Sequence, residues 1–124
     1  MNVADSSGWL ECFADGPNAD VFAPAVENTA ELVMPSISIY QVFKRVLQQR
    51  DESDALQAVA VMQQGTVVDL DTAIALNAAR LSVDLRLPMA DSVMLATARV
   101  YSATLWTQDP DFRNIEGVQY VEKR

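Results

Sequence analysis

Histidine is absent from this 124-residue sequence, and cysteine occurs once, at Cys12. Without histidine the chain cannot build a serine–histidine or cysteine–histidine nucleophile, a histidine general base or the usual zinc ligand sets. A lone thiol cannot form an internal disulfide, and its place in an amphipathic helix pattern predicts a buried, unreactive side chain. Catalysis would therefore depend on carboxylates, hydroxyls, lysine or arginine.

Long apolar runs are absent too, and none approaches the roughly 20 residues that a membrane span needs. The sequence does not open with a basic segment and an apolar core of the kind that directs secretion. Half of the residues are apolar, which excludes a disordered chain, and the length suits one domain with its own core. We expect a single cytoplasmic domain over residues 1–124, without a membrane partner.

Positive charge is scarce: nine lysines and arginines stand against 17 acidic residues, for a net charge of −8. This balance disfavours tight, non-specific binding of nucleic acid, because phosphate contacts come mainly from lysine and arginine. The basic residues are clustered, however, with Lys44, Arg45 and Arg50 close together in one segment. A carboxylate-rich metal site would add negative charge that a bound cation neutralises. The acidity also suits a protein that stays bound to a basic partner.

Strand and helix patterns alternate along the chain. Short apolar segments predict strands over residues 1–4, 31–35, 66–70, 104–107 and 118–121. Helices are predicted over residues 6–13, 21–26, 38–49, 51–64, 71–85 and 89–99. Short apolar strands separated by helices indicate an α/β fold, with a parallel sheet covered on both faces.

Two of these helices are expected to form a hairpin. Ser38 and Gln41 have the spacing of a capping box at the start of the first helix. The second helix is expected to carry Leu56, Val59, Ala60 and Gln63 on one side, and Gly65 is a natural stop after it. The apolar residues of this pair would form either ordinary core or a groove for a helix of a partner protein.

Aspartates follow the predicted strands at both ends of the chain. Asp5 comes directly after the first strand, and Asp109 and Asp111 follow the strand at 104–107. The carboxyl ends of parallel strands meet at one edge of a sheet, which would bring these acids together. Asp91 lies in the first turn of its helix, where the helix dipole would favour the ionised form. Such a cluster of hard oxygen ligands predicts a site for Mg²⁺ or Mn²⁺.

Three segments carry a resemblance to a known family: residues 5–7, 87–91 and 107–112. Together, in this order and spacing, they resemble the motifs of PIN-domain ribonucleases and are most similar to those of VapC-type toxins from toxin–antitoxin pairs. The resemblance implies an α/β/α sandwich with a four- or five-stranded parallel sheet. It also implies an endoribonuclease that depends on Mg²⁺ or Mn²⁺, forms a homodimer and is inhibited by a cognate antitoxin.

Residue by residue, the resemblance assigns catalysis and metal binding to Asp5, Asp91 and Asp109. Ser6 and Thr107 match residues that support the site. Asp111 is a weaker match, with a turn aspartate that caps the local backbone as the alternative.

Four further side chains could contact RNA. Arg45 and Lys44 are candidates to bind phosphate, or they form a solvated helix face. Trp9 and Trp106 could stack bases, although their apolar spacing favours the core.

Gln41 departs from the pattern, because the resemblance implies a second acid at this position. Glutamine keeps the length and one acceptor oxygen of glutamate but lacks the negative charge, so it would weaken cation binding and could not act as a base. The alternative is that Gln41 only completes the capping box. We therefore expect reduced activity.

Two other functions compete with the nuclease. The chain could be a catalytically weak module that mainly binds an antitoxin in a repressor complex. A phospho-acceptor signalling domain also places aspartates at a strand edge, but it requires paired acids after the first strand and a lysine after the last core strand. Here Asp5 is followed by two serines, and no lysine occurs between Lys44 and Lys123.

Overall fold

The computed structural model describes all of residues 1–124. Its strands are β1 (Asn2–Ala4), β2 (Val33–Pro35), β3 (Thr66–Val68), β4 (Thr104–Thr107) and β5 (Val118–Tyr120). Its α-helices are α1 (Ser6–Phe13), α2 (Ala19–Glu27), α3 (Ser36–Gln49), α4 (Glu52–Met62), α5 (Thr72–Leu85) and α6 (Met89–Val100). Two short 3₁₀ helices, η1 (Thr29–Glu31) and η2 (Pro110–Phe112), precede β2 and follow β4. The predicted alternation of strands and helices is confirmed.

All strand pairs are parallel, as predicted. β4 lies between β1 and β5, and β2 pairs with β3. A single bridge between Asn2 and Leu32 links the two parts of the sheet, so the spatial order of the strands is β3, β2, β1, β4 and β5. In the centre of the sheet Ala4 is in register with Trp106, which brings the carboxyl ends of β1 and β4 side by side.

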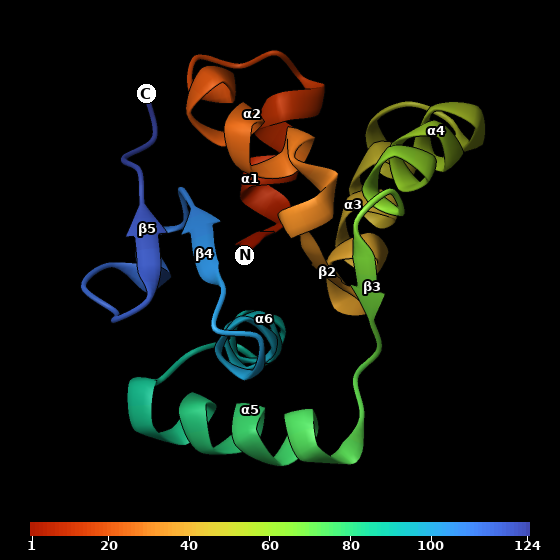
Figure 1. The fold of residues 1–124 in the computed structure, drawn as a ribbon. Helices are drawn as coiled ribbons and strands as arrows, with labels where there is room; N and C mark the ends of the chain where they lie inside the picture. Colours follow the sequence, from red (N-terminus) through yellow and green to blue (C-terminus); the bar gives the residue numbers. More distant parts are fainter.

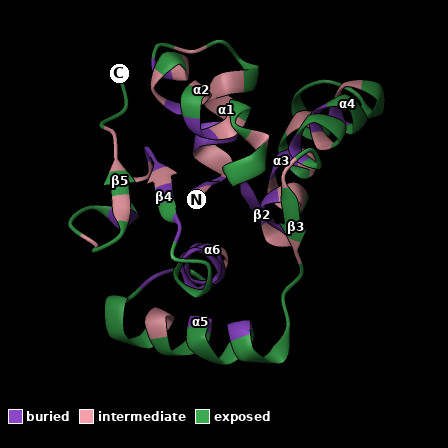
Figure 2. Ribbon diagram, in the orientation of Figure 1, coloured by how far each residue is buried: buried purple, intermediate pink, exposed green.

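Helices cover both sides of the strands (Figure 1). α1 and α2 lie on one side, whereas α6 lies on the other, between the strands and α5. Figure 2 shows the difference in burial between these last two helices: α6 is mostly buried, and α5 exposes most of its surface. Every residue of α6 from Asp91 to Ala98 is buried. The predicted α/β/α fold is confirmed, and its innermost helix carries one of the candidate acids.

The apolar core has two main parts. One lies around β1, β4 and α6 and includes Val3, Leu95, Leu105 and Phe112. The other joins α1, α3 and α4 to β2, and it contains Trp9, Met34, Val42 and Met62. Trp9 is only 1% exposed, so its predicted place in the core is confirmed, and it stacks on Phe13 rather than facing solvent. Complete burial of one large apolar side chain stabilises a fold by about 1.5 to 3 kcal/mol.

The predicted capping box at Ser38 and Gln41 is wrong. α3 begins at Ser36 directly after β2, and Pro35 occupies the N-cap position without a side-chain hydrogen bond. Ser38 therefore lies inside the helix, where it is fully buried, and Gln41 lies a full turn beyond the first residues. The capping interpretation of Gln41 is excluded, because Gln41 lies six residues after the N-cap and Pro35 has no backbone N–H that its side chain could accept.

α3 and α4 form a hairpin as predicted, but the side of α4 that carries Leu56 does not face α3. Ala55, Ala58 and Met62 are the buried residues of α4, whereas Leu56 is 53% exposed. Small alanines allow the helices to approach each other, and this leaves the larger leucine outside. None of the helices combines the length and the apolar surface that a membrane crossing requires.

Candidate metal centre

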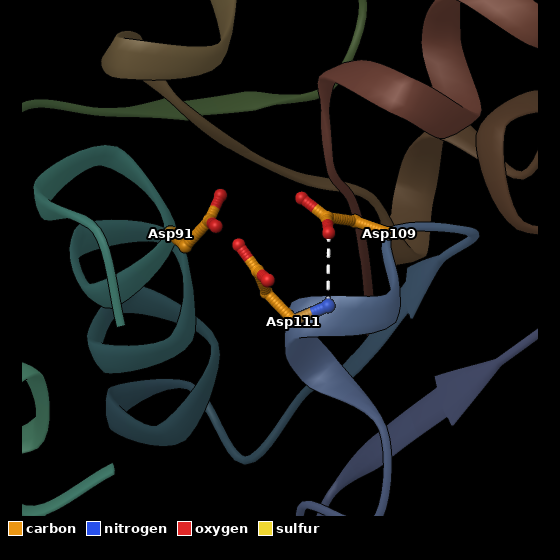
Figure 3. A group of neighbouring side chains, drawn as sticks. All are labelled: Asp91, Asp109 and Asp111. Atoms are coloured by element: carbon orange, nitrogen blue, oxygen red, sulfur yellow. Dashed lines mark hydrogen bonds between the residues drawn. The ribbon is translucent and has the colours of Figure 1, made fainter. Parts of the chain in front are cut away.

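Asp91, Asp109 and Asp111 meet at one place, although Asp91 belongs to α6 and the other two follow β4. One carboxylate oxygen from each residue lies within 4.8 Å of the other two. Figure 3 shows the Asp91 side chain pointing from α6 toward the two aspartates on the segment after β4. Asp91 is 9% exposed, Asp109 is half-buried and Asp111 is exposed, so the cluster is open to solvent on one side.

The turn after β4 holds Asp109 by a backbone contact. Its Oδ1 accepts a hydrogen bond from the Asp111 amide at 2.9 Å and thereby caps η2 (Figure 3). Pro110 at the first position of η2 has a fixed φ angle and suits this tight turn. The capping residue is therefore Asp109, whereas the Asp111 carboxylate is directed into the cluster with Asp91.

Asp5 lies at the end of β1, beside this cluster, and both of its carboxylate oxygens are hydrogen-bonded. Oδ1 accepts from the Ser7 hydroxyl at 2.6 Å and from the Gly8 amide at 3.0 Å. Oδ2 accepts from the Thr107 hydroxyl at 2.6 Å. The residue is only 2% exposed and also serves as the N-cap of α1. These contacts fix the orientation of the Asp5 carboxylate.

Thr107 connects the two strands at the site. Besides donating to Asp5, its hydroxyl oxygen accepts a hydrogen bond from the Asp109 amide at 2.9 Å. The side chain is fully buried at the end of β4. Thr107 therefore lies between the acid that follows β1 and the acid that follows β4.

Burial and mutual repulsion raise the pKa values of two of these acids. Burial raises the pKa of Asp91 to about 7, with further contributions from the charges of Asp109, Asp5 and Asp111. Burial also raises the pKa of Asp5, although hydrogen bonds from Ser7, Thr107 and Gly8 oppose that effect. The helix dipole was expected to favour the ionised form of Asp91; loss of solvation and three nearby carboxylates act in the opposite direction and raise its pKa overall.

The donor set fits a hard divalent cation. All the candidate ligands are carboxylate oxygens, which suit Mg²⁺ and Mn²⁺, and no sulfur or nitrogen ligand is present among them. A bound cation would also remove the repulsion that raises the pKa of Asp91, because it favours the ionised form of every nearby acid.

Gln41 lies on the face of α3 that is turned toward α1. It is half-buried, and its Oε1 is buried without a hydrogen-bond partner. Together with Ser6 and Ser7 it lines a hollow between α1 and α3. Ser6 thus borders the site but makes no hydrogen bond to Asp5; Ser7, the next residue, makes that contact.

The sequence model of the PIN domain family matches residues 3–118 of this chain. The chain belongs to the PIN-domain family. This match covers β1, α6 and β4, and it includes each of the four clustered aspartates. No curated protein matches the chain in sequence at a significant level.

Solved structures of a toxin and of toxin–antitoxin complexes share this fold. A toxin–antitoxin complex from Klebsiella pneumoniae aligns with a TM-score of 0.83 and 20% identity, over 99% of this chain and 100% of that one. VapC20 from Mycobacterium tuberculosis, described as a sarcin-ricin loop cleaving toxin, gives 0.77 and 14%, over 100% and 99%. DNA-bound VapBC from Salmonella typhimurium gives 0.74 and 15%, over 98% of each chain. At these identities the likeness establishes the PIN fold.

Two polar residues of this PIN domain escaped the sequence analysis. The Ser7 hydroxyl donates a hydrogen bond to Asp5 and accepts one from the backbone amide of Gln108 at 3.2 Å. Gln108 is buried and accepts a hydrogen bond from the Asn18 amide group at 2.9 Å. The only available signal for Ser7 was its place in the first turn after an N-cap aspartate, which Ser6 shares. The sequence does not show which of the two serines turns back to the carboxylate.

The Cys12 thiol is unreactive. The thiol is half-buried on α1, and burial raises its pKa to about 11, with help from the charges of Glu27 and Glu11. It therefore stays protonated at neutral pH, which agrees with the predicted unreactive thiol. Trp106 is also half-buried, and its indole nitrogen donates to Asn2 Oδ1 at 2.9 Å, which ties β4 to β1.

Proposed function

We propose that this PIN domain, as one unit over residues 1–124, is a divalent-metal-dependent endoribonuclease and the toxin of a toxin–antitoxin module. The observation that carries the proposal is the cluster of Asp91, Asp109 and Asp111 beside Asp5, at the carboxyl ends of two neighbouring parallel strands. The fold neighbours described as toxins support it. Such an enzyme would meet its RNA in the cytoplasm.

In this proposal Asp5, Asp91 and Asp109 hold Mg²⁺ or Mn²⁺, with Asp111 in support. When bound, the cation supplies Lewis-acid chemistry, since it lowers the pKa of water and offsets negative charge on a phosphodiester under attack. Ser7 and Thr107 keep both oxygens of Asp5 in fixed positions through their hydroxyl donors. Ser6, the residue after Asp5, lines the hollow between α1 and α3.

Gln41 is expected to reduce this activity. An amide lacks the charge that a second acid would add to the cation site, and it cannot accept a proton. Its unpartnered, buried Oε1 also shows that the surrounding residues supply no donor at this point. A glutamate in its place would be half-buried, so loss of solvation would disfavour its charged form unless a cation were bound nearby.

A cognate antitoxin is the proposed protein partner, and the groove between α1, α3 and α4 supports it. This groove has a volume of about 410 Å³ and is lined by Leu10, Phe13, Val46 and Val61 among others. Val42 and Met62 of the same helices are core, so each helix has one face inside and one face available. Homodimerisation is proposed from the resemblance to VapC-type toxins.

RNA cleavage by the purified, antitoxin-free chain, with Mn²⁺ or with chelator, tests the nuclease. We expect fragments only with metal, slow cleavage by the natural chain, and faster cleavage by Gln41→Glu. Asp91→Asn should cut under neither condition, which controls for a contaminating nuclease.

A catalytically weak, antitoxin-binding module is the second candidate, and the amide of Gln41 at the acid position favours it. The DNA-bound neighbour from Salmonella typhimurium is consistent with a role in a repressor complex. If only Gln41→Glu cuts RNA, the natural chain is a disabled nuclease. If neither protein cuts with either metal, the nuclease proposal is rejected and the binding module replaces it.

A further inference from the structure

The hollow between α1 and α3 differs in charge from the rest of the molecule. It has a volume of about 430 Å³ and is lined by Ser6, Ser7, Leu10, Tyr40, Gln41, Lys44, Arg45 and Gln48. No acidic residue lines it, although acids outnumber bases by 17 to nine in the chain. Lys44 and Arg45 are exposed, and neither forms a salt bridge. Two cations without an ion-pair partner favour an anionic ligand in the hollow.

Tyr40 gives this hollow an aromatic wall. The residue is 60% exposed, which is the largest exposure of any aromatic side chain in the structure, so packing in the core does not explain it. The Lys44 ammonium lies 5.8 Å from the centre of the Tyr40 ring, one turn along the same helix. This ammonium lies over one face of the ring, so a base would stack on the other face while Lys44 contacts phosphate.

Ser7 connects the hollow to the carboxylate cluster. It lines the hollow, donates to Asp5 and lies 3.4 Å from the Thr107 hydroxyl at the end of β4. Ser7 is thus common to the hollow and to the carboxylate site, and in the proposal below a strand bound at the carboxylates extends its neighbouring nucleotide toward this residue.

We propose that this hollow is a nucleotide subsite for single-stranded RNA, in which the Tyr40 ring stacks on a base while Lys44 and Arg45 contact phosphate. The proposal rests on the proposed nuclease function and adds to it a residue that selects unpaired RNA. Stacking requires a base that is free of its neighbours, and such bases occur in single strands and loops. Tyr40 is then a substrate-binding residue outside the metal centre.

The test uses binding rather than cleavage. Fluorescence anisotropy would follow a labelled RNA of eight nucleotides with mixed sequence, with Mg²⁺ present, in an Asp91→Asn background that prevents cleavage. Tyr40→Ala should weaken binding by about 5- to 100-fold, which is the range for loss of one aromatic–base contact. Tyr40→Phe should retain most of the affinity because the ring remains. Tyr101→Ala, which alters a 38% exposed tyrosine outside the hollow, is the matched control and should have no effect.

An abasic version of the same oligonucleotide separates stacking from charge. We expect Tyr40→Ala to bind this ligand as well as the Asp91→Asn parent does, because no base is left to stack. Lys44→Ala should weaken binding of both ligands and lower the salt dependence, as expected for a phosphate contact. If Tyr40→Ala loses as much affinity for the abasic oligonucleotide as for the intact one, the stacking role is overturned. Equal affinities of Tyr40→Ala and Tyr101→Ala would overturn the subsite.

The KM for RNA cleavage distinguishes failure of the subsite from failure of the nuclease. Cleavage with the same KM in the natural chain and in Tyr40→Ala would reject the subsite and leave the nuclease in place. Tyr40-dependent binding without cleavage by any metal-loaded protein would reject the nuclease and leave an RNA-binding subsite. If the hollow binds a protein partner instead of RNA, none of the variants should lose affinity for RNA. That result would also reject the proposal.

Discussion

The ionised form of Asp91 is disfavoured in the absence of a cation, both by burial and by nearby acids. Its carboxyl group is buried at the start of α6, and three other acids surround it. The pKa of about 7 follows from this environment, against an ordinary value of 3.8. The folded chain therefore binds a proton on Asp91 between about pH 4 and pH 7 that the unfolded chain releases. Stability must fall as the pH rises through this window.

Asp91→Asn is expected to stabilise the metal-free protein at pH 8. Each tenfold difference in proton affinity between the two states is worth about 1.4 kcal/mol, so the gain should be on the order of 2 to 4 kcal/mol. Near pH 4 the gain should vanish, because Asp91 is then protonated in the folded chain. Urea unfolding in chelator at both pH values measures it. Asp84→Asn, on the exposed face of α5, is the control, and an equal gain at both pH values would contradict the argument.

Thr107 offers a second prediction, because one buried hydroxyl serves both Asp5 and the Asp109 amide. Thr107→Val keeps the shape of the side chain but leaves a buried acceptor and a buried donor without partners. Such losses destabilise a protein by about 1 to 3 kcal/mol. Thr107→Ser should recover most of this stability. Urea unfolding at pH 7 gives the comparison, and Thr104→Val, an exposed threonine of the same strand, should change little.

The acids of the site were predictable from sequence because position in a parallel sheet fixes them. Asp5 follows β1 directly, Asp109 lies two residues after the end of β4, and these two strands are paired. The proton affinity of Asp91 was not predictable, since it depends on burial by segments distant in sequence. The same holds for Ser7, because only the turn of α1 decides which serine reaches Asp5.

At the level of the elements, strand and helix order was predictable, and helix faces were less so. α3 and α4 appear in the predicted order, but α3 starts at Ser36 and α4 buries its alanines instead of Leu56. Two alanines on one face look weakly apolar in a sequence. They become the contact surface because close approach of two helices favours small side chains. Propensity and periodicity do not contain this information.

The connection between α4 and β3 depends on close approach at Gly65. A Cβ atom placed there would lie 2.8 Å from Leu32 Cγ and 2.9 Å from the Leu32 carbonyl oxygen. Leu32 is fully buried, and its carbonyl accepts a hydrogen bond from the Thr66 amide at 2.8 Å. Neither the side chain nor the backbone can move freely, which explains why glycine occupies this position.

Gly65→Ala is therefore expected to destabilise the chain by about 1 to 3 kcal/mol, as overpacking at a rigid contact does. The midpoint of urea unfolding should fall while its slope stays the same. Gln64→Ala, at the exposed neighbouring position, is the matched control. A Gly65→Ala protein as stable as this control would show that Leu32 can shift to make room.

For the whole molecule, the carboxylate cluster joins segments that are far apart in the chain. Asp5 comes after β1, Asp91 lies in the first turn of α6, and Asp109 comes after β4, so the four acids meet only when these three elements are assembled. A net charge of −8 adds general repulsion to the local repulsion among these acids. A cation that binds here would bind the native chain alone, and binding of that kind raises stability by mass action.

We therefore expect Mg²⁺ or Mn²⁺ to raise the Tm by several degrees, since a concentration of 100 times the Kd is worth about 2.7 kcal/mol. Thermal unfolding with each metal, against sodium chloride of equal ionic strength, separates site binding from general screening of the net charge. Asp109→Asn should lose most of the increase because one ligand becomes neutral. Asp69→Asn removes the same charge at an exposed position outside the cluster and should keep the increase. Equal increases in both variants would mean that the cations only screen the acidic surface, and the cluster would then lose its assignment as a metal centre.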